Sequence, residues 1–199
     1  AEKPYDYILI DSLDARLEGN ILKNYNGELE MTVIVVAQPT AAHNDFDGFG
    51  DMFSVAYIEG TGDWGGVGIS AATNGVHARF GNSMGPWSSN DGPAPVVRAA
   101  TNIDSLVSII GTKNENVLSV SVNSKDGVIK SGTDSENRDK PFKNVGTTLA
   151  VGGVLNDESH RRIEENAFKG RVAEVIIYDH VLSTDELDSV NSYISSKYF

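Results

Sequence analysis

Apolar and polar residues alternate in short runs along most of the chain, and this two-residue period is typical of half-buried β-strands. Turn-forming pairs such as Asn26-Gly27 and Asn74-Gly75 separate the runs. The runs that predict strands are 7–13, 28–38, 52–58, 65–71, 76–80, 103–111, 117–123, 128–129, 147–153 and 171–178. With roughly ten to twelve short strands and no internal repeat, the pattern predicts an all-β chain.

Two segments break this pattern, at 41–50 and at 81–102. Three of the six prolines fall within 81–102, and that segment looks too long and too broken for regular structure. Long loops in compact domains are usually functional or mobile. We therefore expect any recognition site to involve the loops at 41–51 and 81–102.

The end of the chain holds the most definite pattern. Residues 171–178 are apolar on both faces of the expected strand, which is typical of a central strand covered on both sides. One face is predicted to hold Val172, Ile176 and Tyr178, and the other Ala173, Val175 and Ile177, with Glu174 the polar exception on the first.

A short helix is predicted to follow this strand. Ser183, Thr184, Asp185 and Glu186 have the spacing of a capping box, in which the Ser183 hydroxyl accepts from the Glu186 N–H. The Glu186 carboxylate then reaches back to the cap and lies near the positive end of the helix dipole. The apolar residues that follow share one stripe of the helix and are Leu187, Val190, Tyr193 and Ile194.

This ending resembles the closing motif of laminin-G-like, concanavalin-A-like jelly-roll domains, which are common in bacterial surface proteins and phage particles. The matching residues are Phe168, Gly170, Val172, Glu174, Val175, Ile177, Tyr178, Leu182, Ser183 and Glu186. Residues 6–10 and 32–39 resemble two opening strands of the same family. Val36 stands where the family usually has Trp, and 106–110 replaces the expected W-H-H-V-A strand.

The resemblance implies a two-sheet antiparallel jelly-roll sandwich with one short C-terminal helix, and 1–199 is expected to be a single domain of this kind. The length suits one domain with a core large enough to be stable without staples. Because the family is mostly a binding and assembly scaffold, the resemblance says little about the ligand. Glu174 is expected to be a structural carboxylate of the closing motif.

Composition excludes several classes of function. The chain has no cysteine, so disulfides, thiolate metal sites and cysteine catalysis are excluded. A net charge of −12 disfavours a nucleic-acid partner, which needs a basic face. The longest strongly apolar run, 33–37, is far shorter than the ~20 residues of a membrane helix, so no membrane insertion is expected.

The acidic segment 43–51 is the best candidate for a metal site. Asp45, Asp47 and Asp51 offer hard oxygen ligands, and Gly48 and Gly50 allow backbone carbonyls to turn inward, as Ca²⁺ coordination requires. The spacing is not that of an EF-hand. Asp and Gly are also ordinary turn residues, so a plain loop is the alternative to a calcium site.

A glycan-binding surface is the second candidate. Trp64 and Trp87 lie in segments rich in Gly, Pro and Ser, and flat aromatic rings stack on the apolar faces of sugars. The polar residues close to them in sequence, which would bond sugar hydroxyls, are Asn82, Asn90, Asp91, His77 and Arg79. The alternative is that each Trp anchors its own loop onto the sandwich.

Catalytic patterns are not found. Residues 68–72 fail the nucleophile-elbow pattern at their last position, and no His belongs to a His-Glu-x-x-His pair. The strand-borne Glu-x-Asp-x-x-Glu of glycosidases built on this sandwich is also missing. We therefore expect a binding protein rather than an enzyme.

Two hypotheses for function follow. The first is a non-catalytic module for carbohydrate recognition or adhesion, outside the cell, on a cell surface or on a virion. The second is a structural or decoration protein of a phage virion or surface layer, whose partners are capsid, tail or surface proteins. The second rests on the compact length, on the absence of a visible signal peptide at the start and on the lack of a sharp site.

Overall fold

A computed structural model of the chain describes its strands, its helix and a few flanking residues. The described residues are 6–10, 17–19, 30–39, 49–59, 63–72, 77–81, 96–100, 105–114, 117–124, 127–134, 149–152 and 168–199. Within them the structure forms two antiparallel sheets and one helix, which confirms the predicted two-sheet sandwich with a C-terminal helix.

The first sheet, sheet A, contains the first and the last of the described strands. Its strands, in spatial order, are β1 (Ile8–Ile10), β12 (Gly170–Tyr178), β3 (Met31–Pro39), β8 (Val107–Asn114), β9 (Val117–Ser124) and β10 (Gly127–Asp134). The closing strand β12 pairs with β1 on one side and β3 on the other. It is therefore an interior strand, as its two apolar faces predict.

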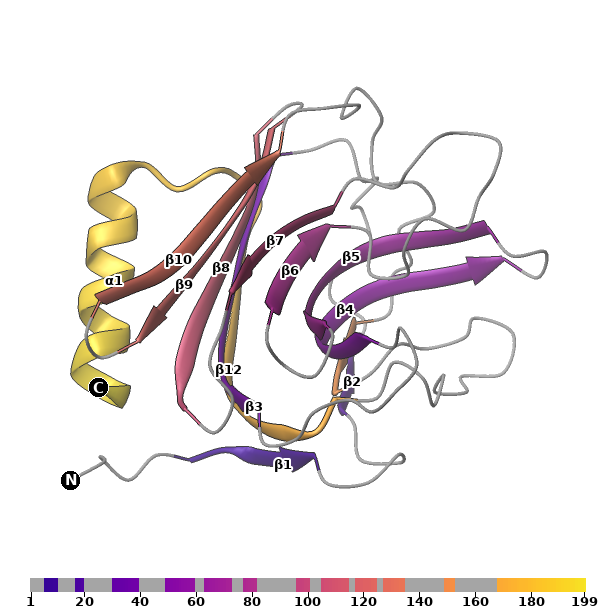
Figure 1. The fold of residues 1–199 in the computed structure, drawn as a ribbon, viewed down its shortest axis with the longest axis horizontal. Coiled ribbons are helices and arrows are strands. Elements are labelled where there is room, and N and C mark those ends of the chain that lie inside the picture. The colour runs from indigo at the N-terminus through magenta and orange to yellow at the C-terminus, as the bar shows by residue number, and fades with distance from the viewer. Residues whose placement is uncertain are drawn as a thin grey trace.

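The second sheet, sheet B, is built from the middle of the chain. Its strands, in spatial order, are β2 (Leu17–Gly19), β11 (Leu149–Val151), β4 (Phe49–Glu59), β5 (Asp63–Ala72), β6 (His77–Gly81) and β7 (Val96–Ala100). Figure 1 shows β4 to β7 on one side of sheet A and the helix α1 (Thr184–Tyr198) on the other. The order of layers is thus helix, sheet A, sheet B.

Strand β3 lies at the centre of this arrangement and is buried on both faces. Val33, Val35 and Ala37 alternate with Ile34 and Val36, and all five side chains are fully buried. The second set packs under α1, where the buried residues are Ile34, Val36, Ile110, Leu182, Ile194 and Tyr198. Because a strand covered on both faces has no polar side to expose, its sequence reads as a continuous apolar run.

The start of α1 is held by local hydrogen bonds, and the predicted capping box is present. The Ser183 N–H donates to Glu186 Oε2 at 2.9 Å, and the Glu186 N–H donates to Ser183 Oγ at 3.4 Å. The Ser183 hydroxyl also donates to Glu186 Oε2 at 2.7 Å. This bond, followed by the bond from the Ser183 N–H, holds the pKa of the Glu186 carboxyl below its usual range. The cap satisfies N–H groups that an isolated helix end leaves without partners.

One buried hydroxyl attaches the segment before α1 to the core. Thr32 is fully buried in β3, and its Oγ1 donates to the His180 carbonyl at 3.0 Å. The same oxygen accepts from the Leu182 N–H at 3.1 Å. A single side chain therefore satisfies two backbone groups of the connection between β12 and α1, which fixes where the helix begins.

The predicted alternation of β12 is wrong at its start. Val172 pairs with Ala37 and Glu174 with Val36, so Ala173 is an extra residue that forms a β-bulge. Val172 therefore shares the face of Ala37, whereas Ile176 pairs with Ile34 on the helix side. Strict alternation predicts that Val172 and Ile176 share one face, because it does not account for the residue inserted at the bulge.

Three predicted connections also contain strands. Residues Leu17–Gly19 form β2 between the predicted strands 7–13 and 28–38, and Val96–Ala100 form β7 within the segment 81–102. Strand β10 continues to Asp134, beyond the two residues predicted for it. Each of these strands pairs with a neighbour, so tertiary pairing overrides the weak local propensity of these segments.

Candidate functional site

Four of the ten residues predicted to bind a glycan or a metal lie in strands of sheet B. Trp64 is in β5, His77 and Arg79 are in β6, and Asp51 is in β4. The prediction that Asp51 belongs to a loop is therefore wrong, because it pairs with Ser70 of β5. The remaining six, Trp87, Asn82, Asn90, Asp91, Asp45 and Asp47, lie outside the described residues.

The strand register aligns several of these residues across sheet B. Asp51 pairs with Ser70, Ser70 with Arg79, and Arg79 with Arg98 of β7. Paired residues in antiparallel strands lie on the same face of a sheet, so these four form one row. Arg98 was missed by the sequence reasoning, although its position between apolar residues in a five-residue run is the signal of a strand with one polar face.

The face that carries this row is opposite the core face. Ile69, next to Ser70 in β5, is fully buried and so marks the side that packs toward sheet A. We name the opposite side of β4 to β7 the Ser70 face. Alternate positions of a strand belong to the same face. By register, the positions of this face in β5 to β7 are Trp64, Gly66, Gly68, Ser70, Ala72, His77, Arg79, Gly81, Val96, Arg98 and Ala100.

The Ser70 face thus unites three of the predicted glycan-binding residues. Trp64 pairs with Ile58 at one end of the face, and His77 and Arg79 lie in β6 at the other. Between them the positions are occupied by glycine, alanine and serine. Glycine in the interior of a strand often marks a place where a ligand approaches the backbone closely. The strand positions of this face therefore combine one tryptophan, one histidine and two arginines with mostly small residues.

On this face of sheet B, the position contributed by β11 is buried. Ala150 of β11 pairs with Ser54 of β4, which pairs in turn with Gly68 on the Ser70 face. The side chain of Ala150 is only 1% exposed. Ala150 therefore adds no exposed position to this face.

The second polar cluster on the described surface holds α1 against sheet A. The Glu174 carboxylate accepts hydrogen bonds from the hydroxyls of Tyr193 and Tyr198, each at 2.8 Å, and Lys197 Nζ lies 3.4 Å away. Lys197 Nζ also lies 2.7 Å from the Tyr193 hydroxyl, and this bond is the main cause that raises the pKa of the Lys197 ammonium. Burial raises the pKa of the Tyr198 hydroxyl to about 12.

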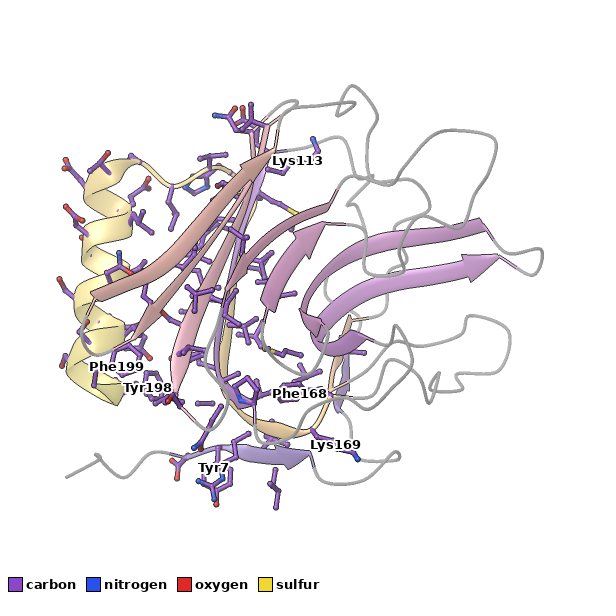
Figure 2. The ribbon with its side chains drawn as sticks, viewed as in Figure 1. Tyr7, Lys113, Phe168, Lys169, Tyr198 and Phe199 are labelled. Carbon is purple, nitrogen blue, oxygen red and sulfur yellow. The ribbon has the colours of Figure 1, made fainter. Side chains whose placement is uncertain are left out.

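This cluster explains why β12 carries a polar residue, Glu174, among its apolar ones. Figure 2 shows Tyr198 and Phe199 at the C-terminal end of α1, where the helix meets the sheet. Glu174 lies on the helix side of β12, and its oxygens are occupied by α1. A carboxylate saturated in this way positions the helix and is poorly placed to act as a general base. The expected structural role of Glu174 agrees with this geometry.

Among the residues that the structure describes, no group of three or more His, Cys, Asp or Glu could hold a metal ion. Calcium remains a prediction, because two of its three proposed ligands are not among those residues. In the same part of the chain, no helix is long and apolar enough to cross a membrane.

A scan of the sequence against protein-family models finds no match, and a search of curated proteins finds none either. Solved structures do resemble the fold. The carbohydrate-binding module CBM40 of the Ruminococcus gnavus IT-sialidase, bound to α2,3-sialyllactose, aligns over 96% of this chain and 97% of its own, with 13% identity and a TM-score of 0.61.

Two further structures come from animals. The heptameric SAP-like pentraxin of Limulus polyphemus aligns over 92% of this chain and 80% of its own, at 13% identity and a TM-score of 0.60. Domains LG4-5 of the mouse laminin α1 chain align over 91% of this chain and 44% of their own, at 11% identity and a TM-score of 0.55. The fold is therefore an all-β, concanavalin-A-like jelly-roll sandwich, as predicted.

Proposed function

We propose that this chain is a non-catalytic glycan-binding module that holds its ligand on the Ser70 face, over β5, β6 and β7. The observation that carries the proposal is the register of sheet B, which collects Trp64, His77 and Arg79 on one face and adds Arg98 to them. The residue types of Trp64, His77 and Arg79 favour glycan chemistry independently of the strand register. A binding site requires such residues on one face of the sheet, and the register gives them that placement.

The residue types suit a sugar. An indole ring offers a flat apolar surface for the apolar face of a pyranose. Serine, histidine and arginine side chains carry donors that suit sugar hydroxyls. The solved CBM40 structure with α2,3-sialyllactose supports the proposal as an example of this fold holding a glycan. We further propose that the module acts outside the cell or on a particle surface, where such ligands occur.

Binding by wild-type protein and by the variants Trp64→Ala and Trp87→Ala on a glycan array tests the proposal. We expect the wild type to bind a defined set of glycans and Trp64→Ala to bind them roughly tenfold more weakly, because a sugar loses its stacking surface. Tyr7→Ala is the matched control, since Tyr7 is an aromatic residue 45% exposed at the edge of sheet A.

The outcomes separate the two functional hypotheses. Equal loss of binding in Tyr7→Ala would show that the effect is not specific to the Ser70 face. If the folded wild type binds no glycan and instead binds a capsid, tail or surface-layer protein, the structural alternative replaces this proposal. Thermal unfolding of each variant shows whether a loss of binding reflects a loss of fold.

Calcium is a separate proposal for the segment around Asp45, Asp47 and Asp51. If the ion binds, millimolar Ca²⁺ at about 100 times Kd stabilises the fold by about 2.7 kcal/mol, which raises the melting temperature by several degrees. Asp47→Asn should remove this shift, whereas Asp188→Asn, which changes an acidic residue of α1, should keep it. An unchanged melting temperature on adding Ca²⁺ or a chelator would exclude the site.

A further inference from the structure

The imidazole ring of His180 lies between two carboxylates where the chain passes from β12 to α1. Its Nδ1 lies 3.3 Å from Asp179 Oδ1, and its Nε2 lies 3.5 Å from Glu186 Oε1. Asp179 directly follows β12, whereas Glu186 belongs to the first turn of α1. One side chain therefore contacts the end of a strand through one ring nitrogen and the start of a helix through the other.

The backbone at His180 is fixed independently of the ring. The buried Thr32 hydroxyl donates to the His180 carbonyl and accepts from the Leu182 N–H. The His180 ring packs edge-on against Tyr178 of β12, with ring centroids 5.8 Å apart. The imidazole is thereby held near both carboxylates, while 46% of the side chain is exposed to solvent. It can therefore exchange protons with water without unfolding of the segment.

The number of protons on the ring decides how many of these contacts are hydrogen bonds. A neutral imidazole carries one N–H, so one ring nitrogen donates and the other presents a lone pair to a carboxylate oxygen. The imidazolium carries two N–H groups and donates to both carboxylates. A protonated ring thus joins β12 to α1, whereas a neutral ring forms a hydrogen bond with only one of them.

We infer that protonated His180, together with Asp179 and Glu186, forms a pH-sensitive bridge that stabilises the first turn of α1. The bridge acts through the capping box. Glu186 Oε2 accepts from the Ser183 N–H and hydroxyl, while Oε1 faces the His180 ring. The imidazolium therefore helps to hold the carboxylate in the orientation that caps the helix. This bridge is independent of the glycan site proposed on sheet B.

The charged groups around the ring favour its protonated form. The hydrogen bond with Asp179 is the largest cause that raises the pKa of His180 above 6.5, and Glu186 raises it further, although desolvation opposes both. The other elements packed here bring no further carboxylate or ammonium group among the described contacts. Strand β3 contributes the hydroxyl of Thr32, and β12 contributes the ring of Tyr178.

The direction of the pH dependence follows from these shifts. Because the pKa of His180 is raised in the folded chain, the stabilisation is fully present below 6.5 and is lost as pH rises through the raised value. The pKa of Glu186 is lowered by folding, so its contribution is present above 4.5 and is lost in more acidic solution. The bridge is therefore complete between 4.5 and 6.5 and opens toward higher pH.

NMR spectroscopy of the intact chain tests the inference between about pH 5 and pH 8, where histidine titrates. The His180 ring should titrate above 6.5. Amide protection factors of Ser183 and Glu186, corrected for intrinsic exchange, should be roughly two- to fivefold larger below this transition than above it, as expected for an exposed ion pair. His180→Gln identifies the ring signal among the four histidines and should remove the pH dependence of these protection factors.

Glu186→Gln separates the bridge from the capping box, because glutamine at this position still caps the helix but carries no charge. In this variant His180 should titrate at lower pH than in the wild type, and the protection factor of Ser183 should no longer follow that titration. Asp185→Asn is the matched control, since it removes the same charge from the same helical turn. The control should keep the pH dependence.

Three results would overturn the inference. If Glu186→Gln shifted the His180 titration no more than Asp185→Asn does, the ring would not bridge to α1. Equal protection factors on the two sides of the wild-type transition would show that the bridge does not stabilise the helical turn. A pH dependence that persisted in His180→Gln would assign the effect to another group.

Discussion

Replacing Phe168 with alanine is expected to lower the free energy of unfolding by about 4 kcal/mol. Phe168 is 1% exposed and is among the largest fully buried side chains of the described core. Figure 2 places it just before the start of β12, in the lower part of the sandwich. A truncated side chain there leaves a cavity that the two sheets cannot fill, because each is held by its own hydrogen bonds.

Phe168 links the two sheets. Its N–H donates to the Gly152 carbonyl at 3.3 Å, and the Gly152 N–H donates to the Met52 carbonyl of β4 at 3.1 Å. Two residues later the chain enters β12 of sheet A. Phe168 therefore lies between the end of β11 in sheet B and the start of β12 in sheet A.

Chemical denaturation monitored by circular dichroism measures the effect. Val117→Ala is the control, because Val117 is 39% exposed and its truncation should change stability by less than about 0.5 kcal/mol. If Phe168→Ala lowered the free energy of unfolding by less than about 1 kcal/mol, the assignment of Phe168 to the core between the sheets would be wrong.

Replacing Gly170 with alanine is expected to cost about 3 kcal/mol or more. Gly170 has φ of 152°, a conformation that residues with a Cβ rarely adopt. A Cβ built at this position would lie 2.3 Å from the Gln38 carbonyl oxygen and 2.7 Å from the Phe168 ring. The first of these atoms belongs to the paired backbone of β3, so the clash is not relieved by a side-chain rotation.

The same denaturation measurement tests Gly170→Ala, with Lys169→Ala as the control at the preceding, exposed position. That control should change stability by less than about 0.5 kcal/mol. If Gly170→Ala were as stable as the control, the close contact between the two strands at this point would be wrong. The result also explains why the closing motif has glycine two residues after its phenylalanine.

The closing strand and helix were predictable because their signals are local. The capping box depends on Ser183 and Glu186, three residues apart, and the apolar run of β12 needs no partner to be recognised. The helix residues Leu187, Val190 and Ile194 do pack against sheet A, whereas Tyr193 is 43% exposed and reaches Glu174 through its hydroxyl. Short-range patterns thus identified the scaffold.

The arrangement of the candidate site was not predictable, because it depends on pairing between distant segments. Asp51, Ser70, Arg79 and Arg98 come from four different strands between residues 51 and 98. No local pattern shows that they share a row, and the prolines just before β7 favoured the prediction of a loop there. The bulge at Ala173 was hidden for the same reason, because only the register with β3 shows the extra residue.

The scaffold and the site also have separate requirements. Gly170, Glu174 and the capping box act within sheet A and its helix, and Phe168 lies between the two sheets, while the proposed ligand lies over β5, β6 and β7 of sheet B. Substitutions in the first group should therefore reduce stability, and substitutions of Trp64, Arg79 or Arg98 should reduce binding with little change in stability. This separation allows the two kinds of variant to be distinguished in one set of experiments.

A crystal structure of the chain with a bound oligosaccharide tests the central claim most directly. We expect sugar density on the Ser70 face, over β5, β6 and β7, with one ring stacked on Trp64. Density for the ligand away from the Ser70 face, for instance over α1 or at the β1 edge of sheet A, would contradict it.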